Sequence, residues 1–322
     1  MRIAITGERG FIARNLARTI AQEGHTFVSL LGGDHLVCSR PTSEPCVYTN
    51  GETQWAAALS DLGVDVLVHN AAVVGTDVVA LSPADATLSN VLGCQVIARA
   101  CKAADVPVCY MGTTVIYDTP RYQHCEITES SEVGPHTYYG ILKLAGERTI
   151  REMARDWMVI RPLFAFGGDG DMNSLIVKGL YAAANNRSGV DMFLDPDKVK
   201  DYLYVDDYCR AVVSCCERGL WGQDFNVAAE TPHSAREIVQ MLSEAAGDDI
   251  EGRLVWHPEV DYLGNHRLTA AKVRMATGWT PRHASLRQSI AHVWQGIKDV
   301  THNPLSHLDE ARSRGVDLLS HY

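Results

Sequence analysis

A tyrosine and a lysine four residues apart, Tyr139 and Lys143, are of the types that exchange protons with alcohols and carbonyls. Residues at this spacing share one face of a helix, so both side chains can enter one site. A phenol has a pKa of about 10 and is a poor base at neutral pH, but a nearby ammonium stabilises the phenolate and lowers that pKa. The pair is therefore suited to move a proton while hydride passes to or from a nicotinamide.

Two threonines offer a third group for this chemistry. Thr113 and Thr114 lie in the run Tyr110 to Tyr117, which begins with a strand-like segment. A hydroxyl at the end of a strand can hydrogen-bond the oxygen that reacts. The alternative is that both hydroxyls only satisfy backbone groups. Because tyrosine and lysine occur at this spacing in many helices, the assignment depends on a nucleotide-binding motif elsewhere in the chain.

Such a motif stands near the start of the chain, where Gly7, Gly10 and Ala13 form the pattern Gly-x-x-Gly-x-x-Ala. Gly7 permits a tight turn, Gly10 lets the backbone approach a pyrophosphate, and the small Ala13 lets the helix pack on the strand. The motif lies between the first strand and the first helix, as a dinucleotide site requires. The residues expected to contact the dinucleotide are Gly7, Arg9, Gly10, Phe11 and Ile12.

The choice of cofactor depends on the end of the second strand, where an acidic residue would bind the ribose of NAD. Leu31 stands at that position, and Asp34 is displaced from it. Arg9, inside the glycine loop, either pairs with the additional phosphate of NADP or is a solvated loop residue. The sequence therefore predicts NAD(P) as the cofactor and favours NADP.

The predicted elements alternate through the first half of the chain. Apolar periodicity predicts strands at Arg2–Thr6, Thr26–Leu31, Asp65–His69, Val108–Met111 and Met158–Arg161. It predicts helices at Phe11–Gln22, Asp85–Ala104 and Tyr138–Arg155. This alternation predicts an α/β fold with a Rossmann-type, doubly wound parallel sheet.

The alternation loosens after about Pro162. Residues 1–165 are expected to form the NAD(P)-binding domain, with segments near 201–230 returning to it. Residues 166–322 are expected to form mainly a smaller C-terminal α/β lobe for the substrate, with helices at Ser174–Asn186 and Ala235–Ala246. Gly167 to Asp171 is expected to be a loop, and the tail from about Thr301 is polar.

The composition of the 322 residues disfavours several classes of protein. A formal net charge of −10 argues against a nucleic-acid partner, since phosphate backbones need a basic field. Apolar runs such as Val64 to Ala72 are too short to cross a bilayer and no signal peptide is recognised, so we expect a cytoplasmic protein without a membrane partner. The nine cysteines form no Cys-x-x-Cys pair and the 13 histidines are scattered, so we expect buried, reduced thiols and no metal site.

Together, these segments resemble the extended short-chain dehydrogenase/reductases, a family of NAD(P)-dependent nucleotide-sugar epimerases, dehydratases and reductases. The resemblance extends over roughly residues 1 to 295. The matching stretches are Thr6–Leu16, Val68–Ala72, Asn90–Gly93, Gly112–Tyr117, Tyr139–Glu147, Arg161–Pro162, Asp201–Asp207, Phe225–Val227 and Gly278–Pro281. So many matches in one order make the resemblance specific.

The resemblance implies roles for individual residues. Tyr139 would be the acid/base, Lys143 would bind the ribose and tune the tyrosine, and Thr113 would be the catalytic hydroxyl. Further cofactor contacts would come from Ala71, Ala72, Asn90 and Pro162. Substrate contacts would come from Thr114, Phe164, Lys200 and Tyr202. The helices Asp85–Ala104 and Tyr138–Arg155 resemble those of a dimer interface in the family, so a homodimer is expected.

Four positions depart from the family patterns. The dehydratases carry Asp-Glu after the catalytic threonine, whereas this chain has Thr114 and Val115, so 4,6-dehydration is not expected. Val115 also stands where the bifunctional GDP-sugar epimerase/reductases carry a cysteine, so their second epimerisation is not expected. Phe164 replaces an asparagine and Lys200 replaces an arginine that usually touch the diphosphate of the substrate, which puts a nucleotide-sugar substrate in question.

Three functions remain open at this stage. The first is an enzyme acting on a sugar nucleotide, by 4-epimerisation with recycled NAD or by 4-keto reduction with exchangeable NADPH. Leu31 and Arg9 favour reduction, while the frequency of activities in the family favours epimerisation. The second is an NADPH-dependent reductase of a non-nucleotide carbonyl compound, with Phe164 as an apolar wall. The third, a protein that binds NAD(P) without turnover, is disfavoured because the proton-transfer residues are all present.

Overall fold

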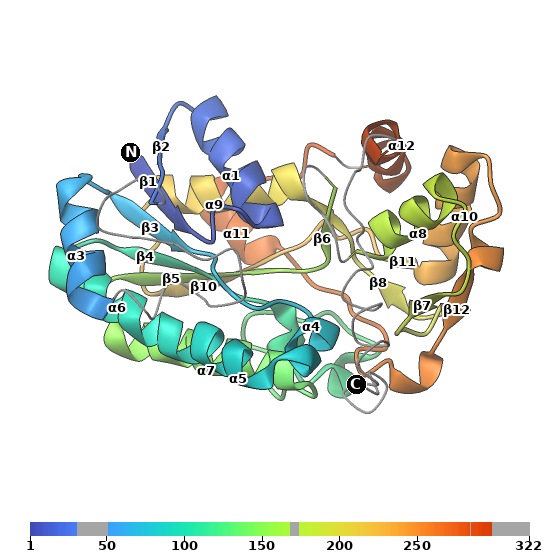
Figure 1. The fold of residues 1–322 in the computed structure, drawn as a ribbon, viewed down its shortest axis with the longest axis horizontal. Helices are drawn as coiled ribbons and strands as arrows, with labels where there is room; N and C mark the ends of the chain where they lie inside the picture. Colours follow the sequence, from blue (N-terminus) through green and yellow to red (C-terminus); the bar gives the residue numbers. More distant parts are fainter. Residues whose placement is uncertain (31–50, 168–173, 284, 298–322) are drawn as a thin grey trace.

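Six parallel strands form the central sheet, in the order β10-β5-β4-β3-β1-β2 (Figure 1). The structure is a computed structural model and describes residues 1–30, 51–167, 174–283 and 285–297. The strands of the sheet are β1 (Arg2–Thr6), β2 (Thr26–Val28), β3 (Val66–His69), β4 (Val108–Met111), β5 (Trp157–Pro162) and β10 (Gln223–Val227). Every neighbouring pair runs parallel, which confirms the predicted doubly wound fold.

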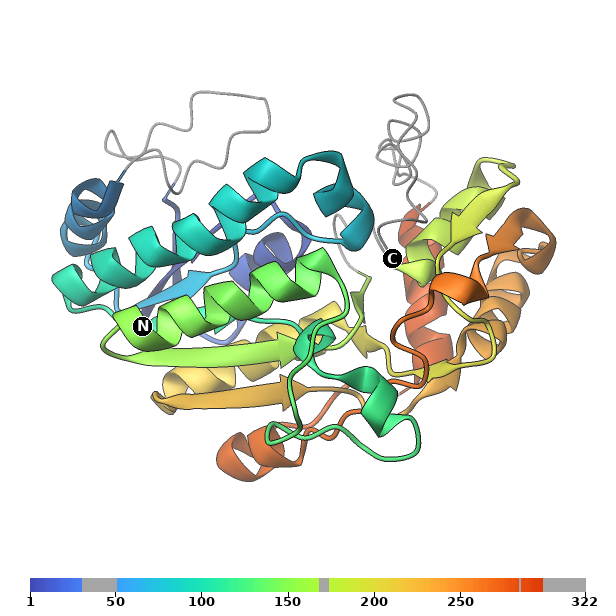
Figure 2. The same cartoon turned by 90° about the horizontal axis from the view of Figure 1, so that it is seen from below.

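Helices cover both faces of this sheet (Figure 2). On one face α1 (Phe11–Gln22) packs against α9 (Val205–Glu217), and on the other face α6 (Gly93–Ala104) packs between α3 (Gly51–Asp61) and α7 (Tyr138–Met153). Strands β3 and β4 are therefore buried at every residue, as their continuous apolar sequence requires. The strand order reverses at β1, and such sheets bind ligands beside the carboxyl ends of the strands at this point.

The helix predicted at Asp85–Ala104 is interrupted. The chain forms α4 (Thr76–Leu81), α5 (Pro83–Thr87) and a π-helical turn at Leu88–Leu92 before α6 begins. Single π-turns inside helices occur often at functional sites. Here the π-turn contains Asn90, whose side chain accepts a hydrogen bond from the amide of Val73 at 2.8 Å and donates one to its carbonyl at 2.9 Å. The turn therefore fixes the segment that follows β3.

Other predicted boundaries shift by a few residues. β2 ends at Val28, three residues before the predicted end, and Leu31 and Asp34 lie outside the described residues. The tail from Thr301 and most of the loop Gly167 to Asp171 also lie outside them. α7 ends at Met153 because Ala154 takes an extended conformation. α3 was not predicted, since only Trp55, Ala58 and Leu59 of its residues are buried.

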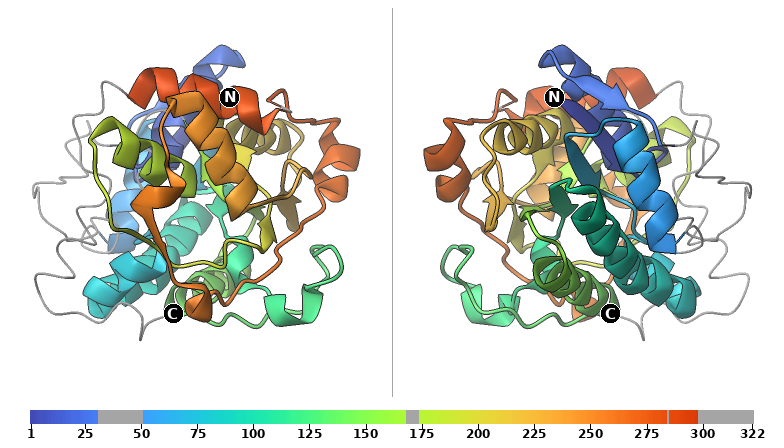
Figure 3. Two further views of the ribbon diagram at one scale, coloured as in Figure 1. Left: turned by 90° about the vertical axis from the view of Figure 1, so that its right-hand side faces the viewer. Right: turned by 90° about the vertical axis from the view of Figure 1, so that its left-hand side faces the viewer.

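The second half builds a smaller group of elements with its own apolar core, seen end-on in Figure 3 (left). Its helices are α8 (Leu175–Ala184), α10 (Ala235–Ala246) and α12 (Leu286–Ile297), and its short strands include β7 (Val190–Met192) parallel to β12 (Leu254–Trp256). Ser234 and Glu237 form a capping box that starts α10. This group is the predicted C-terminal α/β lobe, while the domain boundary after residue 165 stays a prediction.

Short pairs of strands connect the lobe to the sheet. β8 (Val199–Lys200) pairs antiparallel with β11 (His233–Ser234), and β6 (Ala165–Phe166) pairs parallel with β9 (Leu203–Tyr204). α11 (Ala271–Thr277) then returns to pack against α9 and β10. These crossings bring residues after position 199 next to the carboxyl ends of the sheet strands.

The described helices are all too short or too polar to cross a membrane. Within the same residues seven cysteines are free, of which only Cys125 is exposed. Cys215 and Cys216 are buried, as the sequence predicted.

Candidate active site

The glycine loop after β1 has the shape that a dinucleotide needs. Gly7 has φ +72°, and a Cβ placed there would lie 2.9 Å from the Cα of Ala71. The hydroxyl of Thr6 accepts hydrogen bonds from the amides of Asn70 at 3.1 Å and Ala71 at 3.0 Å, which locks the loop against the end of β3. Gly10 caps α1 without any side-chain hydrogen bond, so the first amides of the helix remain available to phosphate oxygens.

Glu8, in the same loop, lies at the end of β2. Its carboxylate accepts hydrogen bonds from the hydroxyl of Ser29 at 2.9 Å and from the amide of Leu30. Sequence reasoning missed this contact, because it expected the acid at the end of the second strand, at Leu31, and not in the glycine loop. Arg9, beside Glu8, is exposed.

The predicted acid/base, Tyr139, lies in the first turn of α7. The helix starts there because Thr137 accepts a hydrogen bond from the amide of Gly140 at 3.1 Å. Tyr139 is 8% exposed, and burial raises its pKa to about 12, while a hydrogen bond with Thr113 opposes the rise. The phenol therefore carries its proton at neutral pH and can donate it to a carbonyl oxygen.

Lys143 lies one turn further along α7 and is also buried. Its Nζ donates to the carbonyl oxygen of Met111 at 2.7 Å and lies 4.3 Å from the centroid of the Tyr110 ring. Burial lowers the pKa of Lys143 to about 8. Burial of the Tyr139 phenol outweighs its hydrogen bond with Thr113, and the expectation that the Lys143 ammonium lowers the pKa of Tyr139 stays a prediction.

A buried hydrogen-bond chain runs behind the lysine. The hydroxyl of Thr6 lies 2.8 Å from Nδ1 of His69, and because it already accepts from two amides its own hydrogen points to this nitrogen. Nε2 of His69 lies 3.5 Å from the sulfur of Cys94, which donates to the carbonyl of Asn90 at 3.1 Å. The chain links the glycine loop to the π-turn.

A cavity of about 280 Å³ opens beside Tyr139. It brings together seven residues predicted from the sequence, namely Thr113, Thr114, Tyr139, Pro162, Phe164, Lys200 and Tyr202. It is also lined by residues that sequence reasoning missed, among them Asp77, Lys178, Asp261, Tyr262 and His266. Asp77 comes from α4, Lys178 from α8 and the other three from the segment after β12, and no local pattern marks them.

The cations of the cavity face carboxylates. Nζ of Lys200 lies 2.6 Å from Oδ2 of Asp261, and both side chains are nearly fully buried. Nζ of Lys178 lies 3.9 Å from Oδ2 of Asp77. Burial lowers the pKa of Lys200, and Asp261 opposes that change. Phosphate groups would therefore meet lysines whose charge is already balanced.

Aromatic rings form another wall of the cavity. The ring of Phe164 stacks on Tyr202 with centroids 5.3 Å apart and meets His266 edge-on at 6.2 Å. Phe164 has φ +25°, a conformation that L residues rarely adopt, so the stacking holds a strained residue in place.

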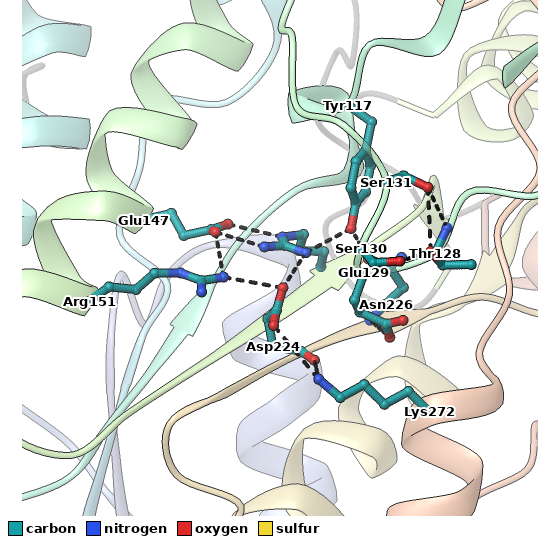
Figure 4. Close-up of polar contacts among 11 residues, drawn as sticks. Tyr117, Thr128, Glu129, Ser130, Ser131, Glu147, Arg151, Asp224, Asn226 and Lys272 are labelled. Carbon is teal, nitrogen blue, oxygen red and sulfur yellow. Dashed lines mark hydrogen bonds and ion pairs between the residues drawn. The ribbon is translucent and has the colours of Figure 1, made fainter. Parts of the chain in front are cut away.

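An ion-pair network fixes α7 to the sheet (Figure 4). Arg161 of β5 donates to both carboxylate oxygens of Glu147, at 3.0 and 2.7 Å, and lies 2.7 Å from Asp224 of β10. Arg151 bridges Glu147 and Asp224 at 2.8 and 3.2 Å. The network lies on the helix that carries Tyr139 and Lys143, so it sets the position of both.

Among the described residues no group of His, Cys, Asp and Glu side chains has the arrangement of a metal site.

A fold with this glycine loop and a buried tyrosine and lysine defines an NAD(P)-dependent oxidoreductase site of the Rossmann type. The model of the NAD dependent epimerase/dehydratase family matches residues 3–228, so the chain belongs to this family. It is an NAD(P)-dependent enzyme of the extended short-chain dehydrogenase/reductase type, as the sequence predicted.

Relatives of known activity cover most of the chain. A UDP-glucose 4-epimerase from Mycolicibacterium smegmatis is 27% identical over 318 residues, which cover 90% of this chain and 96% of the relative. A dTDP-4-dehydrorhamnose reductase from the same organism is 28% identical, with 78% of this chain and 71% of the relative covered. The solved UDP-glucose 4-epimerase from Thermus thermophilus, in complex with NAD, has a TM-score of 0.76 at 19% identity, covering 94% of this chain and 100% of that one.

Proposed function

We propose that this enzyme transfers hydride at a sugar carbon of a sugar nucleotide, by 4-epimerisation or by 4-keto reduction, with Tyr139 as the acid/base. The observation that carries the proposal is the cavity, whose lining includes Tyr139 and Thr113, joined by a side-chain hydrogen bond. The sugar-nucleotide substrate is supported by the relatives, whose names specify UDP- and dTDP-linked sugars.

Different residues of this chain bind the cofactor, transfer the proton and position the substrate oxygen. Gly7, Gly10 and the first amides of α1 would hold NAD(P), and this cofactor supplies or accepts the hydride when bound. Tyr139 gives its proton to the substrate oxygen as a carbonyl becomes an alcohol, and takes a proton back in the opposite direction. Thr113 hydrogen-bonds the same oxygen, and the hydrophobic wall at Phe164 excludes water.

The cofactor preference depends on the two charged residues of the loop. Arg9 supports NADP, as the sequence suggested, but its side chain is exposed. Glu8 supports NAD, because its carboxylate is held at the end of β2, where NAD enzymes place the acid that binds the ribose. A carboxylate there repels an additional phosphate, so we infer that Glu8 outweighs Arg9 and that NAD is preferred.

A homodimer is also part of the proposal. Four exposed apolar side chains gather on the π-turn and the start of α7, namely Leu88, Leu92, Tyr138 and Ile141. We expect Ile141→Glu to convert a dimer into a monomer in light scattering after gel filtration. Met275→Glu, at an exposed residue of α11, is the matched control and should leave the mass unchanged.

A second function is favoured by one observation. The rings of Phe164 and Tyr202 stack, and Lys200 is paired with Asp261, so this wall has little free positive charge to bind a diphosphate. This supports a non-nucleotide carbonyl substrate.

To separate the candidates, the protein is purified without added cofactor and denatured, and the released nucleotide is identified by mass spectrometry. Stoichiometric NAD supports a cofactor-recycling epimerase. An empty site supports a reductase, and the reduction of keto sugars and of simple carbonyl compounds is then assayed.

A further inference from the structure

His266 is a buried histidine on the wall of the cavity. Its side chain has no exposed surface, and its backbone amide donates to the carbonyl of Val199 at 2.8 Å beside β8. Among the described residues neither ring nitrogen, Nδ1 nor Nε2, has a hydrogen-bond partner. Buried polar groups in native proteins are nearly always paired, so two unpaired nitrogens on a residue that lines a cavity point to a partner that binds there.

The charge state of His266 restricts that partner. Burial, with the nearby charge of Lys200, lowers the pKa of His266 to about 3. At neutral pH the ring is therefore uncharged and offers one N–H donor and one nitrogen acceptor. A hydroxyl group matches both, and a carbonyl group matches the donor.

The surroundings of His266 also disfavour a phosphate group. Lys200 is held by Asp261, and Asp261 accepts three more hydrogen bonds, from the amides of Asp195 at 2.8 Å and of Leu263 and Gly264 at 3.1 Å. The carboxylate is thus fixed in place and balances the lysine. Phe164, edge-on to His266, adds an apolar ring beside this balanced ion pair.

From this geometry we infer that His266 is a specificity-determining residue, whose imidazole hydrogen-bonds an uncharged hydroxyl or carbonyl group of the substrate. The inference rests on the proposed function, since it places this contact in the substrate cavity. The group belongs either to the sugar or to the nucleoside.

His266→Leu tests the inference, because leucine has a similar volume and no polar atom. His266→Gln restores a donor and an acceptor. His69→Leu is the matched control, because His69 is equally buried but has Thr6 and Cys94 as partners. Without ligand, we expect His266→Leu to melt at or above the wild-type temperature, whereas His69→Leu melts several degrees lower. A similar fall for His266→Leu would overturn the inference, because the ring would then be a structural residue.

Binding is measured by titration calorimetry on the NAD-loaded enzyme with UDP-glucose and UDP as probes. We expect His266→Leu to weaken one or both probes at least tenfold and His266→Gln to recover most of the loss. A loss confined to UDP-glucose assigns the contact to the sugar, and an equal loss with UDP assigns it to the nucleoside. Unchanged affinities in His266→Leu would contradict the inference. If the wild type binds neither probe, the proposed substrate class fails. The melting temperatures then still decide whether His266 stabilises the fold or is free to bind a ligand.

Discussion

Lys143 donates a hydrogen bond from Nζ to the carbonyl oxygen of Met111 at 2.7 Å and so ties α7 to the carboxyl end of β4. Burial holds the pKa of this lysine at about 8, close to neutral pH. Its charge is therefore present at pH 7 and is lost a little above it. A residue so placed, one turn after Tyr139, can couple the activity of the enzyme to its own protonation.

Replacing Lys143 should affect activity and its dependence on pH together. We expect Lys143→Met to lower kcat/KM by about 100-fold, in the range typical of one proton-transfer group. The wild-type profile of kcat/KM should fall above about pH 8, where Lys143 loses its proton, and this limb should vanish in the variant. Lys102→Met, in the last turn of α6, is the control and should keep the profile. An unchanged limb in Lys143→Met would assign it to another group.

The ion pair between Arg161 and Glu147 should contribute strongly to stability. Both side chains are at most 3% exposed, and removing Glu147 leaves the buried charge of Arg161 with Asp224 as its one carboxylate partner among the described residues. We expect Glu147→Leu to lower the free energy of unfolding by about 3 kcal/mol in urea denaturation. The additional substitution Arg161→Met should recover part of the loss. Asp197→Asn, which breaks the exposed pair with Arg236, should change little, and a comparable loss there would refute the distinction.

Acid should destabilise the fold through its buried histidines. His69 and His266 both have a pKa lowered from 6.5 to about 3. Between these values the unfolded chain binds more protons than the folded one, so the free energy of unfolding falls as pH falls, by about 1.4 kcal/mol per pH unit for each histidine. We expect urea denaturation between about pH 4 and 6 to show that the free energy of unfolding of His266→Leu changes less steeply with pH than that of the wild type. The difference in slope should correspond to about one proton. Equal slopes would mean that His266 is charged in the fold.

Glu8 should set the cofactor preference. We expect Glu8→Gln to strengthen NADPH binding relative to NADH by about tenfold, because it removes the charge that repels the additional phosphate. Arg9→Gln should change the ratio in the opposite direction. Both dissociation constants can be measured by the fluorescence of the reduced nicotinamide. A ratio unaffected by Glu8→Gln would place the ribose-binding acid elsewhere.

The local features of the site could be predicted from the sequence. Gly7, Tyr139 and Lys143 belong to motifs in which each residue lies within a few positions of the next, so helix and strand periodicity place them. The parallel sheet followed from the same alternation. The return of α11 to β10 could not be predicted this way, since it depends on packing between residues far apart in the chain.

The part of the cavity formed by residues after position 199 could not be predicted from local sequence patterns, because its contacts join residues far apart in the chain. Asp261 meets Lys200 across 61 residues, and His266 reaches the cavity only because its segment pairs with β8. The π-turn at Asn90 also has no periodicity of its own, because the single turn Leu88–Leu92 is too short to show a repeat different from that of the helices around it. Glu8 was missed because its side chain crosses from one strand end to another.

The central claim is that Tyr139 exchanges a proton with a sugar nucleotide during hydride transfer. The most direct test is a single-turnover reaction of the NAD(P)-loaded enzyme with UDP-glucose, dTDP-glucose and UDP-glucuronic acid, and with their 4-keto derivatives, analysed by mass spectrometry and NMR. We predict that the wild type converts at least one of them, and that Tyr139→Phe is at least 100-fold slower while binding the cofactor equally well. The control Tyr138→Phe should react at the wild-type rate. A wild type that binds cofactor but converts none of these compounds, or a Tyr139→Phe variant of normal rate, would contradict the account.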